Sequence, residues 1–456
     1  MLVLVTILLP LVAGGLLFAL PREDRALSRT IGVAIAAITV VTLVAGGTSE
    51  WSFRWLARPF EAAFHFGATP ISFWIALLLT ISTACAIAAS RVARLRDFVA
   101  QMLLLEGTML GLFLARDLLL FALFWDLMLV PVFFVLVGWG EHPATAWRYF
   151  IYNFAGGLTL LLATAAFGVI YGSTDVIGRA TAPLVGAWAP WIYAGFAFAF
   201  LVKTPVWPLH TWMPPTYSGL PAPMVAVVSA VQSKAGLYGF LAIGLTLLPH
   251  EVHWYALPLM VLGAVSLIYG AVIALVQNDA KRIVAYSSLS HLGLIAIAVG
   301  SGNPIALRGA LVYIVAHGLF SAALFLVLGY VEERESTRLL ARLGGLGWKN
   351  PKLAGAFCIA VLAALGLPGL AGFAGELLIL IGVYQAGYVW PVIVALIAIV
   401  LASAYFLRLY QDVMNGPEVP DVPVRADLNW SEALAVAPLL AALVLVGVYP
   451  APLLHP

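Results

Sequence analysis

Two lysines, Lys203 and Lys234, lie inside long apolar stretches of this sequence. A charged side chain at the depth of a lipid bilayer is costly, so it is rarely retained without a task. Other titratable residues share such surroundings, and they are Asp126, His291, His317 and Glu376. A chain with titratable groups in several of its apolar segments is predicted to conduct ions, most simply protons.

Asp126 and Lys203 have the side-chain types of a switchable pair. Burial favours the neutral form of a lone carboxyl or a lone amine, whereas proximity of the two favours both charges. The proton affinity of the lysine then depends on its distance from the carboxylate, which suits the input element of a pump. The alternative is a static ion pair that only holds two helices together.

Lys234 lies one apolar segment further along, and His291 and His317 follow in successive segments. Imidazole titrates near neutral pH and can pass protons on. Nearby hydroxyl groups, such as that of Tyr286, could hold water in the same layer. We therefore expect a relay through these groups that ends at Glu376. The alternative for each histidine is a hydrogen-bonded packing residue.

Three further residues are weaker candidates. Glu106 could lie near the middle of a helix with a function, or could pair with Arg96 or Arg116. His210 and Tyr217 lie near the expected cytoplasmic end of an apolar segment and could gate access to the path.

The composition is that of a membrane protein. Of the 456 residues, 63% are hydrophobic and 10% are charged, with a mean hydropathy of +1.03. Soluble domains stay near half apolar. A net charge of +2 without a basic cluster gives no indication of nucleic-acid binding. The sequence has no phosphate loop, zinc spacing, nucleotide fingerprint or iron–sulfur cysteine run, so no cofactor, metal or ATP site is expected in this chain.

Apolar runs of about twenty residues recur along the whole length, each long enough to cross a bilayer. Backbone groups in lipid must form hydrogen bonds within their own segment, so these runs are predicted to be helices. The sequence predicts an all-α polytopic membrane protein with about fourteen transmembrane spans. The predicted spans are 2–20, 29–47, 70–90, 97–115, 117–137, 146–171, 186–213, 221–248, 255–276, 283–300, 306–330, 353–384, 388–411 and 432–450.

Spans 7 and 12 carry helix breakers in their middle, at Lys203-Thr204-Pro205 and at Gly366-Leu367-Pro368-Gly369. Such breaks survive in lipid only when they are buried in protein or line a polar cavity. Paired broken helices in two halves of a chain indicate inverted repeats around an ion path. We expect spans 4–8 and 9–13 to form two inverted five-helix repeats; the alternative is that the breakers are simple kinks.

This interpretation divides the chain into four predicted parts. They are the N-terminal transmembrane helices (1–96), the first repeat (97–248), the second repeat (255–411), and a cytoplasmic loop with the last transmembrane helix (412–456). Of the 23 Lys and Arg residues, sixteen fall in alternate loops on one side of the predicted membrane and five on the other. The positive-inside rule therefore places both termini on the non-cytoplasmic side.

Several sequence blocks resemble one family of membrane proteins. The blocks are KTPVWPLHTWMPP with SKAGLYG, QNDAKRIVAYSSLSHLGLI, AHGLFSAALFLVLG, GLPGLAGFAGELLIL and RDLLLFALFWDLMLVPVFFVLVGWG. They resemble the signatures of the antiporter-like subunits of respiratory complex I and of multisubunit Na+/H+ antiporters, over about residues 97–411. The DLMLVP block and the acid in GFAGE favour similarity to the M-type chain of bacterial NADH–quinone oxidoreductase.

The resemblance implies a role for each candidate. Asp126 matches the family's carboxylate on span 5, and Lys203 matches the lysine on span 7 that pairs with it. Lys234 matches the central lysine on span 8, and Glu376 matches the acid at the proton exit. The resemblance also implies that His291 and His317 are histidines of the family's polar axis. The family usually has Glu at the Asp126 position, so the pair with Lys203 is expected to be longer or bridged by water.

Two more departures from the family pattern occur. Pro215-Thr216-Tyr217 stands where the family usually has Asp-Ala-His, which removes the expected histidine at the cytoplasmic mouth, and Arg148 replaces a lysine near the start of span 6. The resemblance implies a proton-translocating subunit of the bacterial cytoplasmic membrane. Its expected partners are the L-type and N-type antiporter-like chains, the lipid bilayer and protons, with the redox cofactors held by other subunits. The alternatives are a chain of a multisubunit Na+/H+ antiporter or membrane-bound hydrogenase, and a structural or assembly subunit with an inactive channel.

Overall fold

The computed structural model describes residues 1–21, 24–178, 183–417 and 426–454. They fall into two compact units, of which the first comprises Met1–Pro205 and Val231–Ala256 and the second Val206–Ala230 and Leu257–Pro456. Part of the loop-charge argument (Arg22, Arg179 and Arg425) lies outside the described residues, as does part of the predicted cytoplasmic loop. The division into four parts and the inverted relation of the repeats stay predictions.

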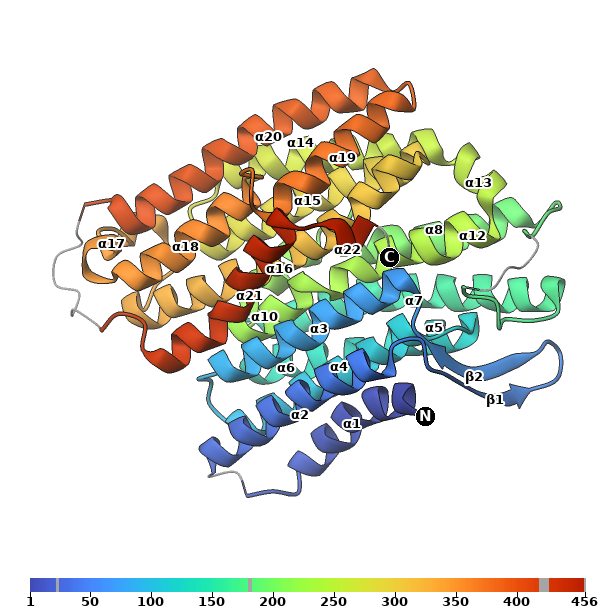
Figure 1. Ribbon diagram of the computed structural model, residues 1–456, viewed down its shortest axis with the longest axis horizontal. Coiled ribbons are helices and arrows are strands. Elements are labelled where there is room, and N and C mark those ends of the chain that lie inside the picture. Colours follow the sequence, from blue (N-terminus) through green and yellow to red (C-terminus); the bar gives the residue numbers. More distant parts are fainter. Residues whose placement is uncertain (22–23, 179–182, 418–425, 455–456) are drawn as a thin grey trace. The chain divides into compact units, whose positions relative to one another are not determined.

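The first unit is a set of helices with one β-hairpin (Figure 1). Helix α4 is its best-buried long helix and packs against α1, α2, α3, α5 and α6. The elements of this unit are α1 (Leu2–Leu17), α2 (Arg25–Gly46), β1 (Glu50–Leu56), β2 (Ala62–Gly67), α3 (Pro70–Ala89), α4 (Leu95–Leu114), α5 (Leu118–Leu127), α6 (Leu129–Trp139), α7 (Pro143–Tyr171), α8 (Ala189–Lys203), a 3-10 turn (Gln232–Lys234), α11 (Ala235–Gly239), a π turn (Phe240–Gly244), α12 (Leu245–Leu247) and α13 (Pro249–Trp254).

The second unit is built around α16, in which every residue from 309 to 331 is buried. This helix packs against α10, α15, α18, α19 and α21. The elements of this unit are α9 (Met213–Gly219), α10 (Ala222–Ala230), α14 (Ala256–Val276), α15 (Ala280–Ser301), α16 (Pro304–Glu335), a 3-10 turn (Leu340–Arg342), α17 (Leu346–Lys349), α18 (Pro351–Ala364), α19 (Ala371–Gln385), α20 (Val389–Tyr410), a π turn (Gln411–Asn415), α21 (Trp430–Val448) and α22 (Ala451–Leu454).

The predicted helical membrane fold is confirmed, but the count of fourteen spans is not. Within the described ranges, 11 helices are long and apolar enough to cross a membrane. Four apolar helices are shorter, namely Leu2–Leu17, Ala189–Lys203, Pro351–Ala364 and Ala371–Gln385. The last three are the pieces of predicted spans 7 and 12, which break where the sequence places proline and glycine.

Two more breaks are present that the sequence analysis did not predict. Span 5 divides into α5 and α6 at Met128. Pro131 explains this break, because it has no N–H to donate to the carbonyl of Leu127. Span 8 leaves the α-helix at Val231, which has φ −133°, and continues through the 3-10 turn that carries Lys234. The break at Val231 has no proline or glycine from which it could be predicted.

The segment between α2 and α3 forms an antiparallel hairpin that the sequence analysis did not predict. β1 pairs with β2 from Glu50 opposite Gly67 to Leu56 opposite Ala62. The Trp55 and Phe64 rings lie 4.9 Å apart across the strands, a pairing typical of sheets. The segment is too polar for a membrane span.

Side-chain caps fix the starts of three helices that carry candidate residues. Asp117 accepts hydrogen bonds from the Leu119 and Leu120 N–H groups at the start of α5. Asp279 and Asn303 cap α15 and α16 in the same way. Capping satisfies the free N–H groups of a first helical turn and so sets the register of the helix that follows.

Candidate functional site

Asp126 lies on the last turn of α5, directly before the break at Met128. Its carboxylate faces α7, where a Cβ on Gly157 would overlap the Oδ1 atom. Among the described residues this oxygen has no hydrogen-bond partner. Glycine at position 157 therefore makes the space that the carboxylate occupies.

Lys203 is the last residue of α8 and is fully buried. Its ammonium group and the Asp126 carboxylate are close enough for a Coulombic interaction, but within the described ranges they form no ion pair at 4.0 Å or less. The Nζ atom instead lies 5.1 Å from the centroid of the Trp125 ring. The predicted pair is thus present as two neighbouring groups that are not in contact.

Lys234 closes the 3-10 turn of span 8 and is also fully buried. Its Nζ atom lies 3.4 Å from the Ser233 hydroxyl. The Gln232 side chain ties this turn to α7 and to span 5, because its Nε2 donates to the Tyr149 hydroxyl at 2.8 Å and to the Met128 carbonyl at 3.3 Å. One amide therefore links the break beside Asp126 to the turn that carries Lys234.

The glycines of the SKAGLYG block allow α11 to pack directly on α8. A Cβ on Gly236 would overlap the Phe200 carbonyl oxygen and the Thr204 hydroxyl, and one on Gly239 would overlap the Phe200 ring. Since Phe200 lies one turn before Lys203, this close approach sets the segment of Lys234 against the end of α8.

Glu106 lies on α4 and is fully buried. Neither of its carboxyl oxygens has a hydrogen-bond partner among the described residues. The alternative that Glu106 pairs with Arg96 or Arg116 is wrong for this reason, and the two arginines instead form ion pairs with Asp97 and Glu50. A buried carboxyl without such a partner remains a candidate for proton storage.

In the second unit, Glu376 follows the break between α18 and α19. The Tyr313 hydroxyl on α16 donates to its Oε1 atom at 2.5 Å. Its Oε2 atom lies where a Cβ on Gly366 would be, and Gly366 has φ +69°, a conformation that favours glycine. The break in the helix thus provides the space that the carboxylate occupies.

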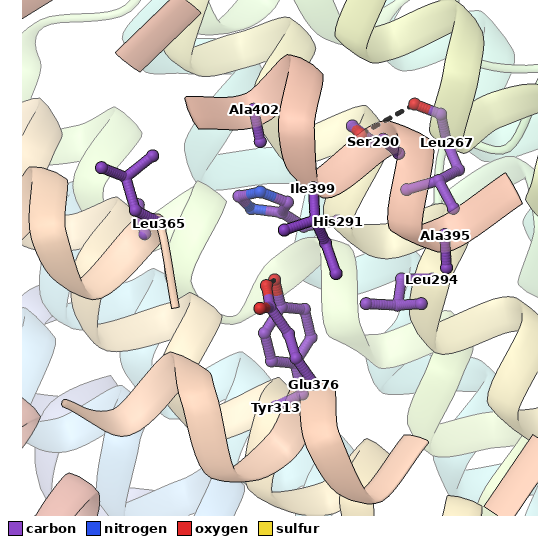
Figure 2. A pocket seen from close by; sticks show the side chains of 12 residues that line it. Leu267, Ser290, His291, Leu294, Tyr313, Leu365, Glu376, Ala395, Ile399 and Ala402 are labelled. Carbon is purple, nitrogen blue, oxygen red and sulfur yellow. Dashed lines mark hydrogen bonds between the residues drawn. The ribbon is translucent and has the colours of Figure 1, made fainter. Parts of the chain in front are cut away.

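His291 and Glu376 line one small cavity together with Tyr313 and Ser290 (Figure 2). The His291 ring faces the carboxylate and the phenol across this cavity. Its volume of about 10 Å³ is of the order that one water molecule needs. The His291 and His317 rings lie 5.6 Å apart, and those of His291 and Tyr313 lie 5.9 Å apart. The structure therefore brings together both histidines and the predicted exit acid.

His210 and Tyr217 are both buried in the second unit. The His210 ring packs on Tyr269 at 5.1 Å, and the Tyr217 ring packs on Phe325 at 5.8 Å. Their predicted role as a gate stays a prediction.

Three residues near the candidates were not singled out from the sequence. Tyr313 precedes His317 by four residues, so helical spacing could have placed it on the same face. Gln232 is a polar residue in an apolar run and precedes Lys234 by two, which is a usable signal. Trp125 carried no signal, since aromatic residues are common in membrane helices.

The family profile described as "NADH:quinone oxidoreductase/Mrp antiporter, TM" matches residues 115–402. The chain belongs to this family. A protein of Rhodobacter capsulatus named NADH-quinone oxidoreductase subunit M is 35% identical over 373 residues, covering 78% of this chain and 73% of the relative. The resemblance to the M-type chain stated from the motifs is confirmed.

Solved structures agree with this assignment. A chain of respiratory complex I from Thermus thermophilus has a TM-score of 0.89 and 31% identity, and the match covers 100% of this chain and 97% of that one. A chain of the Mrp complex from Dietzia sp. DQ12-45-1b also has a TM-score of 0.89, covering 99% and 95% of the two chains. At 21% identity, the likeness to the Mrp chain shows the fold alone.

Proposed function

We propose that this chain is the M-type, proton-translocating membrane subunit of an NADH–quinone oxidoreductase, or complex I. Protons would move along Asp126, Lys203, Lys234, His291, His317 and Glu376, coupled to quinone reduction elsewhere in the complex. One observation carries the proposal: Asp126, Lys203 and Lys234 each lie at a helix break, and the Glu376 carboxylate lies against Gly366 in the break between α18 and α19. In a membrane such breaks are tolerated where they line a polar path.

The pair in the first unit would act as the input element. The proton affinity of Lys203 depends on the distance to the Asp126 carboxylate, so a change in this distance would drive a proton toward Lys234. The histidines would pass the proton on, since each imidazole can accept at one nitrogen and donate from the other. Glu376 would receive it through the water-sized cavity and release it on the far side.

The proposal places the chain in the bacterial cytoplasmic membrane with both termini on the non-cytoplasmic side. Its partners would be the L-type and N-type antiporter-like chains of the same complex. NADH oxidation, quinone reduction and their redox groups are assigned to other subunits, and no cofactor is assigned to this chain.

The test is Lys234→Ala in the complete complex, reconstituted in vesicles. We expect the protein to insert and assemble, and most proton translocation per electron pair to be lost. Lys352→Ala is the matched control, because Lys352 is exposed at the start of α18 and should be silent.

Other outcomes separate the alternatives. Normal proton translocation by Lys234→Ala would contradict the relay and favour a structural subunit. Translocation by the parent that requires sodium, measured in sodium-free and sodium-containing buffer, would favour a cation antiporter chain.

A further inference from the structure

The ammonium group of Lys203 lies against an aromatic ring. Lys203 is fully buried, and within the described residues its Nζ atom has no hydrogen-bond partner. The contact that remains is with Trp125, whose ring centroid is 5.1 Å away. Burying an ammonium group without compensation is costly, so this ring contact is the feature that offsets the cost.

The placement of Trp125 fits such a role. The indole is fully buried, and its Nε1 atom has no hydrogen-bond partner among the described residues, so no polar contact accounts for tryptophan at this position. The rings of Phe121 and Phe200, whose centroids lie 5.6 and 5.7 Å from it, hold the indole in place. Indole attracts a cation over its face more strongly than the other aromatic side chains do.

Asp126 follows Trp125 directly on α5, so the two side chains leave the helix about 100° apart. The Asp126 carboxylate lies against Gly157 and does not form a close ion pair with Lys203. Lys203 therefore has two alternative partners on consecutive residues of one helix.

We propose that Trp125 is a positioning residue that holds the Lys203 ammonium group by a cation–π contact while the group is separated from Asp126. The proposal rests on the proposed function and adds a defined second position for the lysine. In this position the cation keeps a favourable electrostatic contact, so it can leave the carboxylate without being stranded among apolar groups. Trp125 thereby lowers the cost of separating the pair.

The test is a graded one in the complete complex. Tryptophan analogues with one, two and three ring fluorines are inserted at position 125 by nonsense suppression, and proton translocation per electron pair is measured at matched assembly levels. Fluorine weakens the cation–π contact while hardly changing the size of the ring. We expect translocation to fall stepwise, by about tenfold across the series. Equal translocation by all four complexes would overturn the proposal.

Conventional variants give a second readout. Trp125→Phe keeps an aromatic face and should retain more activity than Trp125→Leu, while Phe167→Leu on α7, which removes a buried ring that packs on Tyr171, is the packing control. If Trp125→Leu does not assemble, the fluorinated series still decides.

The failure of the proposed function can be told apart from the failure of this inference. Thermal inactivation of the purified complex is measured for trifluorotryptophan at position 125, for Lys203→Met and for the two changes combined. A cation–π contact predicts that the effects of the two changes on thermal inactivation are not additive. This outcome does not depend on the proton translocation of Lys203→Ala, which is measured separately. Strictly additive effects would overturn the contact, whereas normal translocation by Lys203→Ala would overturn only the proposed function.

Discussion

At the level of single residues, the charge at position 126 can be separated from the reach of its side chain. Asp126→Glu keeps the charge and carries the carboxylate further toward Lys203, so we expect activity near that of the parent. Asp126→Asn keeps the volume but leaves the buried ammonium of Lys203 without a counter-charge, and we expect proton uptake to fall by about tenfold or more. Quinone-dependent electron transfer and proton uptake, in membranes at matched assembly levels, measure both. Equal activity of Asn and Glu would mean that this charge is not coupled to transport.

The Tyr313 hydroxyl can be removed without changing the ring that packs beside His291. In Tyr313→Phe, Glu376 loses its hydrogen bond at 2.5 Å, which for a charged acceptor contributes about 1.5–3 kcal/mol. We expect normal assembly and a severalfold loss of proton translocation, measured in reconstituted vesicles. Tyr313→Leu, which also removes the ring, separates packing from hydrogen bonding. If Tyr313→Phe pumps like the parent, the hydroxyl does not position the exit acid.

At the level of helices, a break with a local cause can be predicted from the sequence, whereas a break without one cannot. Proline and glycine predict the ends of α8 and α18, and Pro131 could have predicted the break at Met128. No proline or glycine stands at Val231. At this break Gln232 forms hydrogen bonds with Met128 and Tyr149, which are distant in the sequence. The residue types of the candidate site could therefore be predicted, but the contacts of Lys203 and Glu376 could not.

The close packing of α11 on α8 gives a prediction about stability. Gly236→Ala places a methyl group on the Phe200 carbonyl, and overpacking of this kind costs about 1–3 kcal/mol. We expect less assembled complex in membranes and a lower temperature of thermal inactivation. Gly355→Ala on α18 is the matched control, because a Cβ there meets nothing within 4 Å. A Gly236→Ala complex as stable as Gly355→Ala would show that the two segments can separate without cost.

At the level of the whole chain, composition and motifs are sufficient for the helical membrane fold and the family, whereas the number of crossings is not settled by them. Among the residues that the structure describes, 11 helices are long enough to span, and the shorter α8, α18 and α19 end or begin at the breaks in spans 7 and 12. The loop-charge bias predicts that the hairpin residue Arg54 faces outward and that Arg342, between α16 and α18, faces the cytoplasm. These two sites lie on opposite sides only if an odd number of crossings separates them.

Single cysteines test this arrangement. Both sites are exposed, so Arg54→Cys and Arg342→Cys are each introduced into a variant with Cys85 and Cys358 replaced by alanine. A membrane-impermeant maleimide applied to intact cells should label position 54 at once and position 342 only after the membrane is opened. The reverse pattern would overturn the predicted orientation but keep the odd number of crossings. Labelling of both from the same side would mean that one of the broken spans between them does not cross, and Asp126, Lys203 or Lys234 would then lie on a segment that enters and leaves by the same face.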